Sequence, residues 1–348
     1  MPLPAIDEKF LVDFLVRLLN IPSPTGYAQD AIDFCDHYLA NYPLRLEHNR
    51  KGALIVTWPG RRQDAPRGLT AHVDTLGAMV KDIKPNGRLK LTKLGNFAWN
   101  TVEGEGVTVF ASSGDERRGS LLLTKASTHV YGAAVNETKR DDDVMEVRLD
   151  ERTVSAEQTR GLGIRVGDFL AFDPRVELRN GFVRSRHLDD KACVACIVTA
   201  FKALRDAGQV PAQTVTALIT NYEEVGHGAA TGFPPGMIEL LAVDMAAVGD
   251  GQTSDEFHAS LCVKDSGGPY HHGLSQKLRG LAEAEGIPYQ VDIYPYYGSD
   301  GEAYWRAGGD VAVALIGPGV DASHNYERTH LEALAATTRW VLAYLLCP

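Results

Sequence analysis

Thr216-Ala-Leu-Ile-Thr-Asn-Tyr-Glu-Glu-Val-Gly-His-Gly228 is a stretch in which an apolar run ends in two adjacent carboxylates followed by glycine. The apolar part predicts a buried strand, and α/β proteins place their chemistry at the ends of such strands. Adjacent residues that leave a strand point in different directions. One carboxylate of the pair Glu223-Glu224 could therefore hold a metal while the other faces a substrate, which suits metal-assisted hydrolysis.

Other candidate metal ligands also lie next to predicted elements. They are His72 and Asp74 after residues 68–71, Asp244 after 240–243, His324 a few residues beyond 311–316, and Asp189-Asp190 at the start of a helix. Hydrolytic metal sites use imidazole and carboxylate ligands, and a site for two ions needs a carboxylate that bridges them. Each residue alone is also compatible with a buried histidine, a turn or a helix cap. Their joint occurrence at the ends of strands favours a metal site.

The order of the predicted elements indicates the fold class. Helices are expected over 7–19, 28–40, 190–207, 271–285 and 331–346, and strands over 54–58, 68–71, 214–220, 240–243, 289–293 and 311–316. Between 77 and 183, short β-like runs alternate with Gly, Asn and Asp turns. We therefore predict an α/β domain, with a mixed sheet flanked by helices, formed by residues 1–76 and 184–348. Residues 77–183 are predicted to form an inserted, β-barrel-like domain.

The composition excludes several functional classes. The net charge is -10 and the basic residues form no long runs, so no nucleic-acid partner is expected. No apolar run approaches the roughly 20 residues needed to span a bilayer, and the N-terminus lacks the pattern of a signal peptide. Five scattered cysteines favour a reducing compartment, and we expect a cytoplasmic protein without membrane contact. Cys193 and Cys196 lie in an apolar helical pattern and are predicted to be buried.

Five motifs carry a resemblance to a known family. They are His72-Val-Asp74, Leu188-Asp-Asp-Lys191, Tyr222-Glu-Glu-Val-Gly226, Ala242-Val-Asp244 and Ser323-His324. In order and spacing the chain resembles the di-metal aminopeptidases of peptidase family M42, which includes glutamyl and other aminopeptidases that form tetrahedral assemblies. The similarity extends over nearly the whole chain and implies a di-zinc exopeptidase-like fold. The chain is also similar to a bacterial sub-branch of this family linked to an N-acetylglutaminylglutamine amide osmoprotectant system.

The resemblance implies two divalent metal ions, with zinc expected and cobalt or manganese also suited to such ligands. It assigns His72, Asp189 and Asp244 to one ion, and Asp189, Glu224 and His324 to the other. Asp189 would then bridge the two ions. Four negative charges, from the three ligand carboxylates and Glu223, would repel one another in one pocket, and two divalent cations would offset them.

The same resemblance implies roles for three residues that are not ligands. Asp74 would orient His72, and Glu223 would be the general base that takes a proton from a metal-bridging water and returns it to the leaving amine. Asp300, in Gly298-Ser-Asp-Gly301, matches a family turn near the substrate pocket, although a plain turn is equally compatible with the sequence. Thr75 and Lys191 replace the glutamate and arginine that are usual in the family, which bears on substrate orientation rather than on the metals.

We therefore expect a metallo-aminopeptidase that removes N-terminal residues from short peptides. The inserted domain is expected to serve homo-oligomerisation, based on dimers and extending up to a dodecamer. A related di-metal amidohydrolase or carboxypeptidase acting on acylated amino acids or dipeptides is the main alternative, and a non-catalytic assembly or binding protein is another. Lys264-Asp-Ser-Gly-Gly-Pro269 imitates the nucleophile segment of trypsin-like serine proteases, but it lies in an α/β pattern and lacks the expected glycine before aspartate.

Overall fold

The computed structural model describes residues 2–348, which divide into two compact units. The α/β unit comprises the chain up to Asp74 together with Arg175–Pro348, and the barrel unit comprises Thr75–Pro174. The predicted boundary near 183 therefore lies at 174. The reason is that β10 (Glu177–Arg179) and β11 (Phe182–Ser185) form a small sheet with β18 (Glu327–His330), which belongs to the α/β unit.

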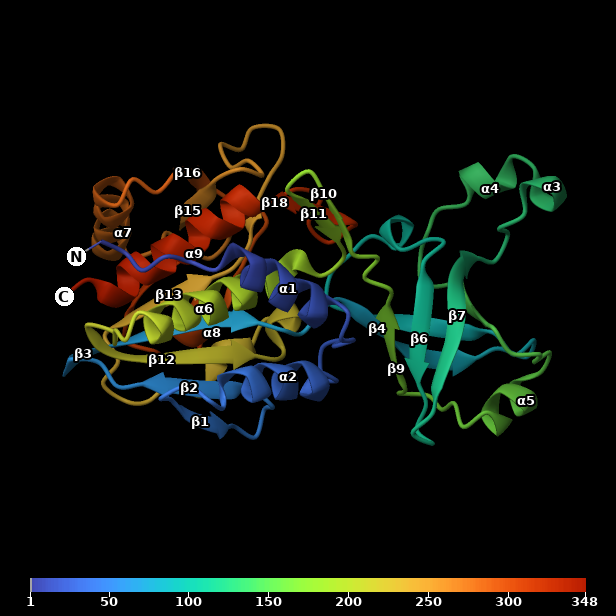
Figure 1. Cartoon of the computed structure of the whole chain (residues 1–348). Helices are drawn as coiled ribbons and strands as arrows, with labels where there is room; N and C mark the ends of the chain where they lie inside the picture. Colours follow the sequence, from blue (N-terminus) through green and yellow to red (C-terminus); the bar gives the residue numbers. More distant parts are fainter. Residues whose placement is uncertain (1) are drawn as a thin grey trace. The chain divides into compact units, whose positions relative to one another are not determined.

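The main sheet of the α/β unit is mixed, as predicted. Within the described residues it has nine strands in the order β1-β2-β12-β3-β13-β17-β15-β16, with β14 paired to β17 (Figure 1). These are β1 (Arg45–His48), β2 (Leu54–Trp58), β3 (Arg62–His72), β12 (Gln213–Thr220), β13 (Glu239–Val243), β14 (Ala246–Ala247), β15 (Ala259–Lys264), β16 (Tyr289–Ile293) and β17 (Ala312–Val320). Strands β12, β3, β13 and β17 are mutually parallel, so their carboxyl ends meet at one edge.

Alternation along the central strands shows how the sheet is covered on both faces. In β13, Leu241 and Val243 contribute to the larger core cluster, whereas Leu240 and Ala242 contribute to a second cluster. The larger cluster contains the apolar sides of α1 (Glu8–Leu19), α2 (Gln29–Leu39), α6 (Leu188–Asp206), α7 (His272–Ala284) and α9 (Leu331–Leu346). The second cluster lies on the other face, beside α8 (Asp300–Arg306). Both faces of the parallel strands are thus buried, as their continuous apolar sequences predict.

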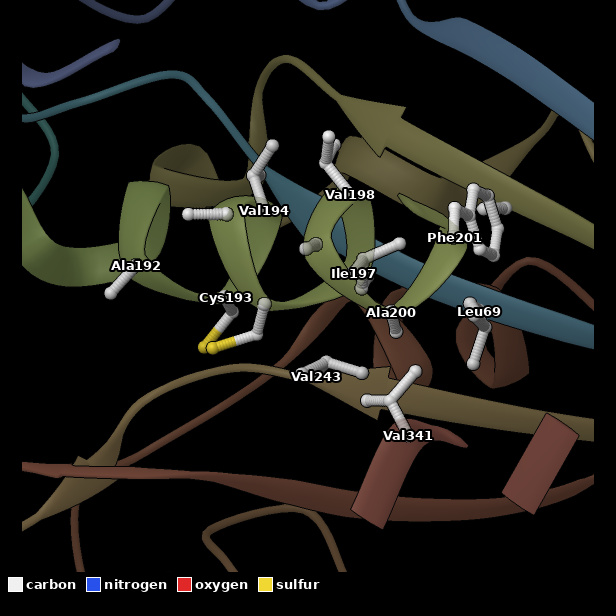
Figure 2. Close-up of a cluster of buried hydrophobic side chains, with 14 of the residues drawn as sticks. Leu69, Ala192, Cys193, Val194, Ile197, Val198, Ala200, Phe201, Val243 and Val341 are labelled. Carbon is white, nitrogen blue, oxygen red and sulfur yellow. The ribbon is translucent and has the colours of Figure 1, made fainter. Parts of the chain in front are cut away.

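Helix α6 is almost entirely buried and contacts both α1 and α9. In Figure 2, Cys193 points toward Val243 and Val341, whereas Val194 and Val198 point to the opposite side of the helix. Cys193 and Cys196 are both 0% exposed, which confirms the prediction that they are buried. All five cysteines in the described chain are free of disulfides.

The barrel unit has its own core. Its strands close in the order β4-β5-β8-β7-β6-β9. They are β4 (Gly77–Ile83), β5 (Leu89–Leu94), β6 (Gly106–Phe110), β7 (Glu116–Leu123), β8 (Met145–Leu149) and β9 (Phe169–Phe172). Short helices lie between them: η1 (Trp99–Thr101), α3 (Thr128–Tyr131), α4 (Ala134–Glu137) and α5 (Ala156–Gly161). In the barrel unit the carboxylate of Glu146 is buried and is paired with Lys84 and Arg88.

The predicted fold class is confirmed, and most predicted elements of the α/β unit are present. The sequence interpretation missed the short strands β1, β10, β11, β14 and β18, the strand β15 and the helix α8, which begins in the segment Gly298-Ser-Asp-Gly301 that was also compatible with a turn. Across residues 2–348, no helix is both long enough and apolar enough to cross a membrane.

Candidate metal centre

Strand register brings the predicted ligands to one level of the sheet. His72, the last residue of β3, is opposite Thr220, the last residue of β12. Thr70 is opposite Ala242 in the neighbouring strand β13, so Asp244 follows at the level of His72. Glu223 and Glu224 lie in the short helix η2 (Glu223–Val225), which begins three residues after the last residue of β12. The carboxyl ends of parallel strands thus assemble the site, as the sequence predicts.

Asp189 lies between the two histidines. Its Oδ1 is 3.2 Å from His72 Nε2, and its Oδ2 is 3.3 Å from His324 Nε2. Asp189 is 8% exposed, and the peptide bond that joins it to Asp190 is cis. Because one oxygen faces each histidine, the carboxylate has the geometry of a bridge between two neighbouring sites.

Two groups of side chains could each hold a metal ion. One contains Asp189, Glu224 and His324, the residues that the resemblance assigns to the second ion. The other contains His72, Asp190 and Asp244, so that Asp190 stands where the sequence prediction had Asp189. Asp190 is fully buried; its Oδ2 accepts the backbone N–H of His72 at 3.2 Å, and its Oδ1 has no hydrogen-bond partner within residues 2–348. Both aspartates therefore adjoin His72, but Asp189 alone faces both histidines.

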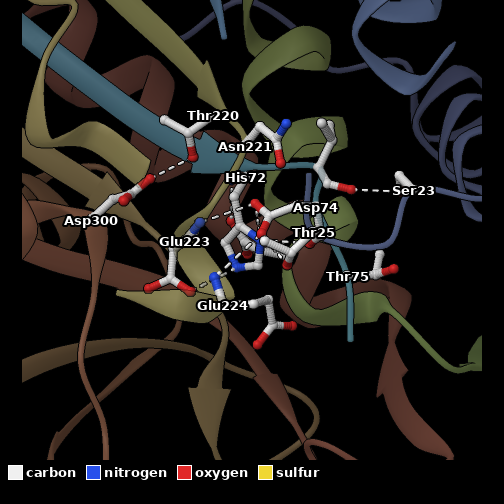
Figure 3. Close-up of polar contacts among 12 residues, drawn as sticks. Ser23, Thr25, His72, Asp74, Thr75, Thr220, Asn221, Glu223, Glu224 and Asp300 are labelled. Carbon is white, nitrogen blue, oxygen red and sulfur yellow. Dashed lines mark hydrogen bonds and ion pairs between the residues drawn. The ribbon is translucent and has the colours of Figure 1, made fainter. Parts of the chain in front are cut away.

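Asp74 connects the site to the loop after β12. Figure 3 shows its carboxylate beside Thr25, Glu223 and Glu224. It accepts the backbone N–H groups of Glu223 at 3.1 Å and Glu224 at 3.3 Å. The direct partner of His72 Nδ1 is the backbone carbonyl of Asp74 at 2.8 Å, whereas the carboxylate lies 3.6 Å away. The predicted orientation of His72 is thus provided mainly by the main chain, and the carboxylate holds the two glutamates.

Glu223 faces the imidazole of His72, with Oε2 at 3.6 Å from Nε2. Burial raises the pKa of Glu223 well above its usual value; His72 opposes this shift and Asp244 adds to it. A carboxyl group with a raised pKa is well matched to proton transfer near neutral pH.

The remaining carboxylates carry more negative charge than the protein groups offset. Burial raises the pKa of Glu224 to about 8 and that of Asp244 to about 7, and in both cases Asp189 adds to the shift. Asp189 is the exception: burial acts upward, but His324 and His72 hold its pKa well below the usual value. For His72 the balance is the reverse, because burial acts downward while Asp189 and Glu223 raise its pKa well above the usual value. Imidazole and carboxylate donors around a surplus of buried negative charge fit divalent cations.

Glu327 is a site residue that the sequence interpretation missed. Its buried carboxylate accepts the backbone N–H of Asp189 and that of His324, each at 3.1 Å. Three residues next to or within the candidate site have a left-handed backbone conformation. They are His187, Tyr222 and His324, with φ values of 70°, 78° and 62°. Such residues cluster at functional sites.

Asp300 lies beside the last residue of β12. It is 3% exposed, and its carboxylate accepts the hydroxyl of Thr220 (Figure 3). The same carboxylate accepts the backbone N–H of Ala229. Gly228 packs against it so closely that a Cβ there would lie 2.4 Å from Asp300 Oδ1. Asp300 therefore anchors the loop that follows Glu223 and Glu224, and its contact with substrate stays a prediction.

Lys191 does not face the site. It is 0% exposed, and its ammonium donates to the carbonyls of Leu18 at 3.1 Å and Ile21 at 2.6 Å, where α1 ends. Burial lowers the pKa of Lys191 to about 7. Its role is to join α1 to α6.

The resemblance to a serine protease has no structural basis. The Ser266 hydroxyl donates to the carbonyl of Pro295 at 3.1 Å and accepts the N–H of Tyr297 at 3.0 Å. Both ring nitrogens of His72 face Asp74 and Asp189 instead. Among residues 2–348, no hydroxyl nucleophile is therefore paired with this histidine.

Together, the fold and the site define a class: hydrolases built on an α/β sheet, with candidate metal ligands at the carboxyl ends of the parallel strands. Residues 52–340 match the family model described as M42 glutamyl aminopeptidase. YhfE of Bacillus subtilis (strain 168), which bears an aminopeptidase name, is 46% identical over 97% of both chains. The glutamyl aminopeptidase of Lactococcus lactis subsp. cremoris (strain MG1363) is 24% identical over 91% of this chain and 90% of that protein.

Solved structures agree on the fold. Aminopeptidase APDkam598 of Desulfurococcus kamchatkensis superposes with a TM-score of 0.87 at 21% identity, covering 97% of this chain and 95% of that one. TET1 peptidase of Pyrococcus horikoshii, described as assembling into a tetrahedron or a large octahedral shell, gives 0.84 at 22% identity over 97% and 99%. The chain belongs to the M42 glutamyl aminopeptidase family, and it is an aminopeptidase, a hydrolase of peptide bonds.

Proposed function

We propose that this aminopeptidase uses two divalent metal ions to remove N-terminal residues from short peptides. The observation that carries the proposal is the position of Asp189, whose two carboxylate oxygens face His72 and His324 at 3.2 and 3.3 Å. In this proposal His72, Asp189 and Asp244 hold one ion, and Asp189, Glu224 and His324 hold the other. Zinc is the expected metal, and cobalt or manganese suits the same ligands.

When bound, the ions would polarise the scissile carbonyl and lower the pKa of a water molecule. Glu223 accepts the proton of the attacking water and delivers it to the nitrogen of the leaving amine. Its raised pKa is consistent with holding that proton between the two transfers. Asp74 keeps Glu223 in place through the backbone N–H. Asp190 stabilises the backbone of His72 by accepting its N–H.

The free α-amine of the substrate separates this proposal from the alternative of an amidohydrolase. Metal-loaded protein is assayed with dipeptides and with matched N-acetylated dipeptides, and N-acetylglutaminylglutamine amide serves as a blocked compound. We expect hydrolysis of the free peptides and at least about a 100-fold lower kcat/KM for the blocked ones. Preference for the blocked peptides would overturn the proposal in favour of an amidohydrolase.

We further propose that the protein forms a dimer-based homo-oligomer, up to a dodecamer, through the barrel unit, and that it works in the cytoplasm. The assembly of the TET1 peptidase and the five free cysteines support these two proposals. Light scattering coupled to gel filtration tests the first: a monomer at micromolar concentration would contradict it.

A further inference from the structure

Glu327 links two ligand candidates that come from distant parts of the chain. It is the first residue of β18 and is opposite Ser185 of β11, close to the start of α6. Its Oε2 accepts the N–H of Asp189 and its Oε1 accepts the N–H of His324, both at 3.1 Å. One carboxylate therefore determines the separation between the main chains of Asp189 and His324.

Neither of these main chains is held by regular secondary structure. Asp189 has a ψ of 105°, outside the helical range although it lies in the first turn of α6. His324 has a left-handed φ of 62° in the connection between β17 and β18. A side chain on an irregular backbone is directed by whatever fixes that backbone. Here the common fixed point is Glu327, which is only 2% exposed.

Glu224, the third member of this group, is fixed in a different way. Its backbone N–H is bound by Asp74, as is that of Glu223. The site thus rests on two carboxylate clamps: Asp74 holds the loop after β12, and Glu327 holds Asp189 and His324. Loss of one clamp leaves the other in place, so the effects of the two clamps can be separated by experiment.

We propose that Glu327 is a positioning residue that sets the affinity of the metal site formed by Asp189, Glu224 and His324. The inference rests on the proposed two-metal function. It extends that function by assigning a residue that holds ligands without touching the metal or the substrate. Residues that orient ligands in this way typically change metal affinity by about 10–100-fold when they are replaced.

The test is a titration of metal-free Glu327→Gln with Co²⁺, followed by visible absorption and by calorimetry. Glutamine keeps the size of the side chain, but its NH₂ group would face one of the two N–H donors, so one of the two bonds is lost. We expect wild-type protein to bind two ions. We expect the variant to bind the ion held by Asp189, Glu224 and His324 about 10–100-fold more weakly. The other ion shares only Asp189 with this group, so its affinity should fall less.

The control is Glu146→Gln, which removes a buried carboxylate from the barrel unit, where its ion-pair partners are Lys84 and Arg88. We expect this variant to lose stability while both metal affinities stay unchanged. If Glu327→Gln does not fold, Glu327→Asp replaces it, because a side chain shorter by one methylene retains the charge but cannot reach both N–H groups. Excess Co²⁺ should restore kcat in the Glu327 variant with little change in KM, which a purely structural defect would not do.

Two outcomes would overturn the proposal, and they are distinguishable. The first is that the wild-type protein binds two ions and each Glu327 variant binds them with the same two affinities as the wild type. The proposed role of Glu327 would then be wrong, while the two-metal function would stand. If wild-type protein binds no second ion, the proposed function fails and the inference fails with it.

Discussion

The carboxylate of Asp74 accepts the backbone N–H of Glu223 at 3.1 Å, which ties the end of β3 to the proposed proton shuttle. The same carboxylate also accepts the N–H of Glu224 and the hydroxyl of Thr25. The backbone carbonyl of Asp74, in turn, faces His72 Nδ1. A single residue therefore positions two candidate metal ligands, His72 and Glu224, together with the proposed base.

Replacing Asp74 with asparagine should test this arrangement. The amide has one acceptor oxygen, so one of the two N–H groups in the loop loses its partner, while the backbone carbonyl that faces His72 remains. We expect kcat to fall about 10–100-fold, as measured by steady-state kinetics with a free dipeptide. Thr25→Val is the matched control, because it removes the hydroxyl donor to Asp74 while Asp74 keeps its bonds to both loop N–H groups, and it should change kcat less than about threefold. Equal losses in both variants would contradict the proposed role.

Gly228→Ala should disturb the loop that follows Glu223 and Glu224 at the point where it packs against Asp300. The added Cβ would lie 2.4 Å from Asp300 Oδ1, so either the carboxylate or the loop must move. We expect kcat/KM to fall at least about tenfold and the melting temperature to drop by a few degrees. Gly249→Ala is the control, since no atom lies within 4 Å of a Cβ at that position. Full activity of Gly228→Ala would show that the Asp300 contact does not position the site.

The stability of metal-free protein should depend on pH in a defined direction. The pKa of Glu224 is raised to about 8 and that of Asp244 to about 7, so between about pH 5 and about pH 7 the folded state retains protons that the unfolded state has lost. His72, whose pKa is also raised, contributes stability that is lost as the pH rises through the folded value. These groups therefore act in the same direction.

We expect the melting temperature of chelator-treated protein to fall by at least about 5 °C between about pH 5 and about pH 7, as measured by calorimetry. Lys191, with a pKa lowered to about 7, opposes this trend only above that pH. Added Zn²⁺ should remove most of the fall, because it stabilises the ionised carboxylates. A melting temperature that rises with pH in metal-free protein would contradict the conclusion that the carboxylates of this site repel one another when they are ionised.

Much of the site could be predicted because it depends on local patterns. An apolar run followed by His72, by Glu223-Glu224 or by Asp244 predicts a buried strand with a polar end, and parallel pairing then aligns these ends. The assignment of Asp189 as the bridge came from the resemblance alone. The pattern of two adjacent aspartates does not say which one faces both histidines, because that depends on the backbone conformation where α6 begins.

Glu327 could not be recognised in the same way. The segment His324-Asn-Tyr-Glu-Arg328 has the polar composition of an exposed turn, and an acidic residue next to an arginine is typical of a surface. Its burial results from the pairing of β18 with β11, residues that are more than 140 positions apart in the chain. Long-range pairing of two short strands leaves no local periodicity. The domain boundary near 183 was wrong for the same reason.

Kinetics and metal analysis of Glu223→Gln test the central claim most directly. Glutamine keeps the shape of the side chain and its backbone bond to Asp74, but it cannot accept the proton of the attacking water. We predict that the variant retains two metal ions per chain and loses about 10²–10⁴-fold in kcat with free dipeptides. A variant that binds both ions and still turns over at a rate near that of the wild type would contradict the account.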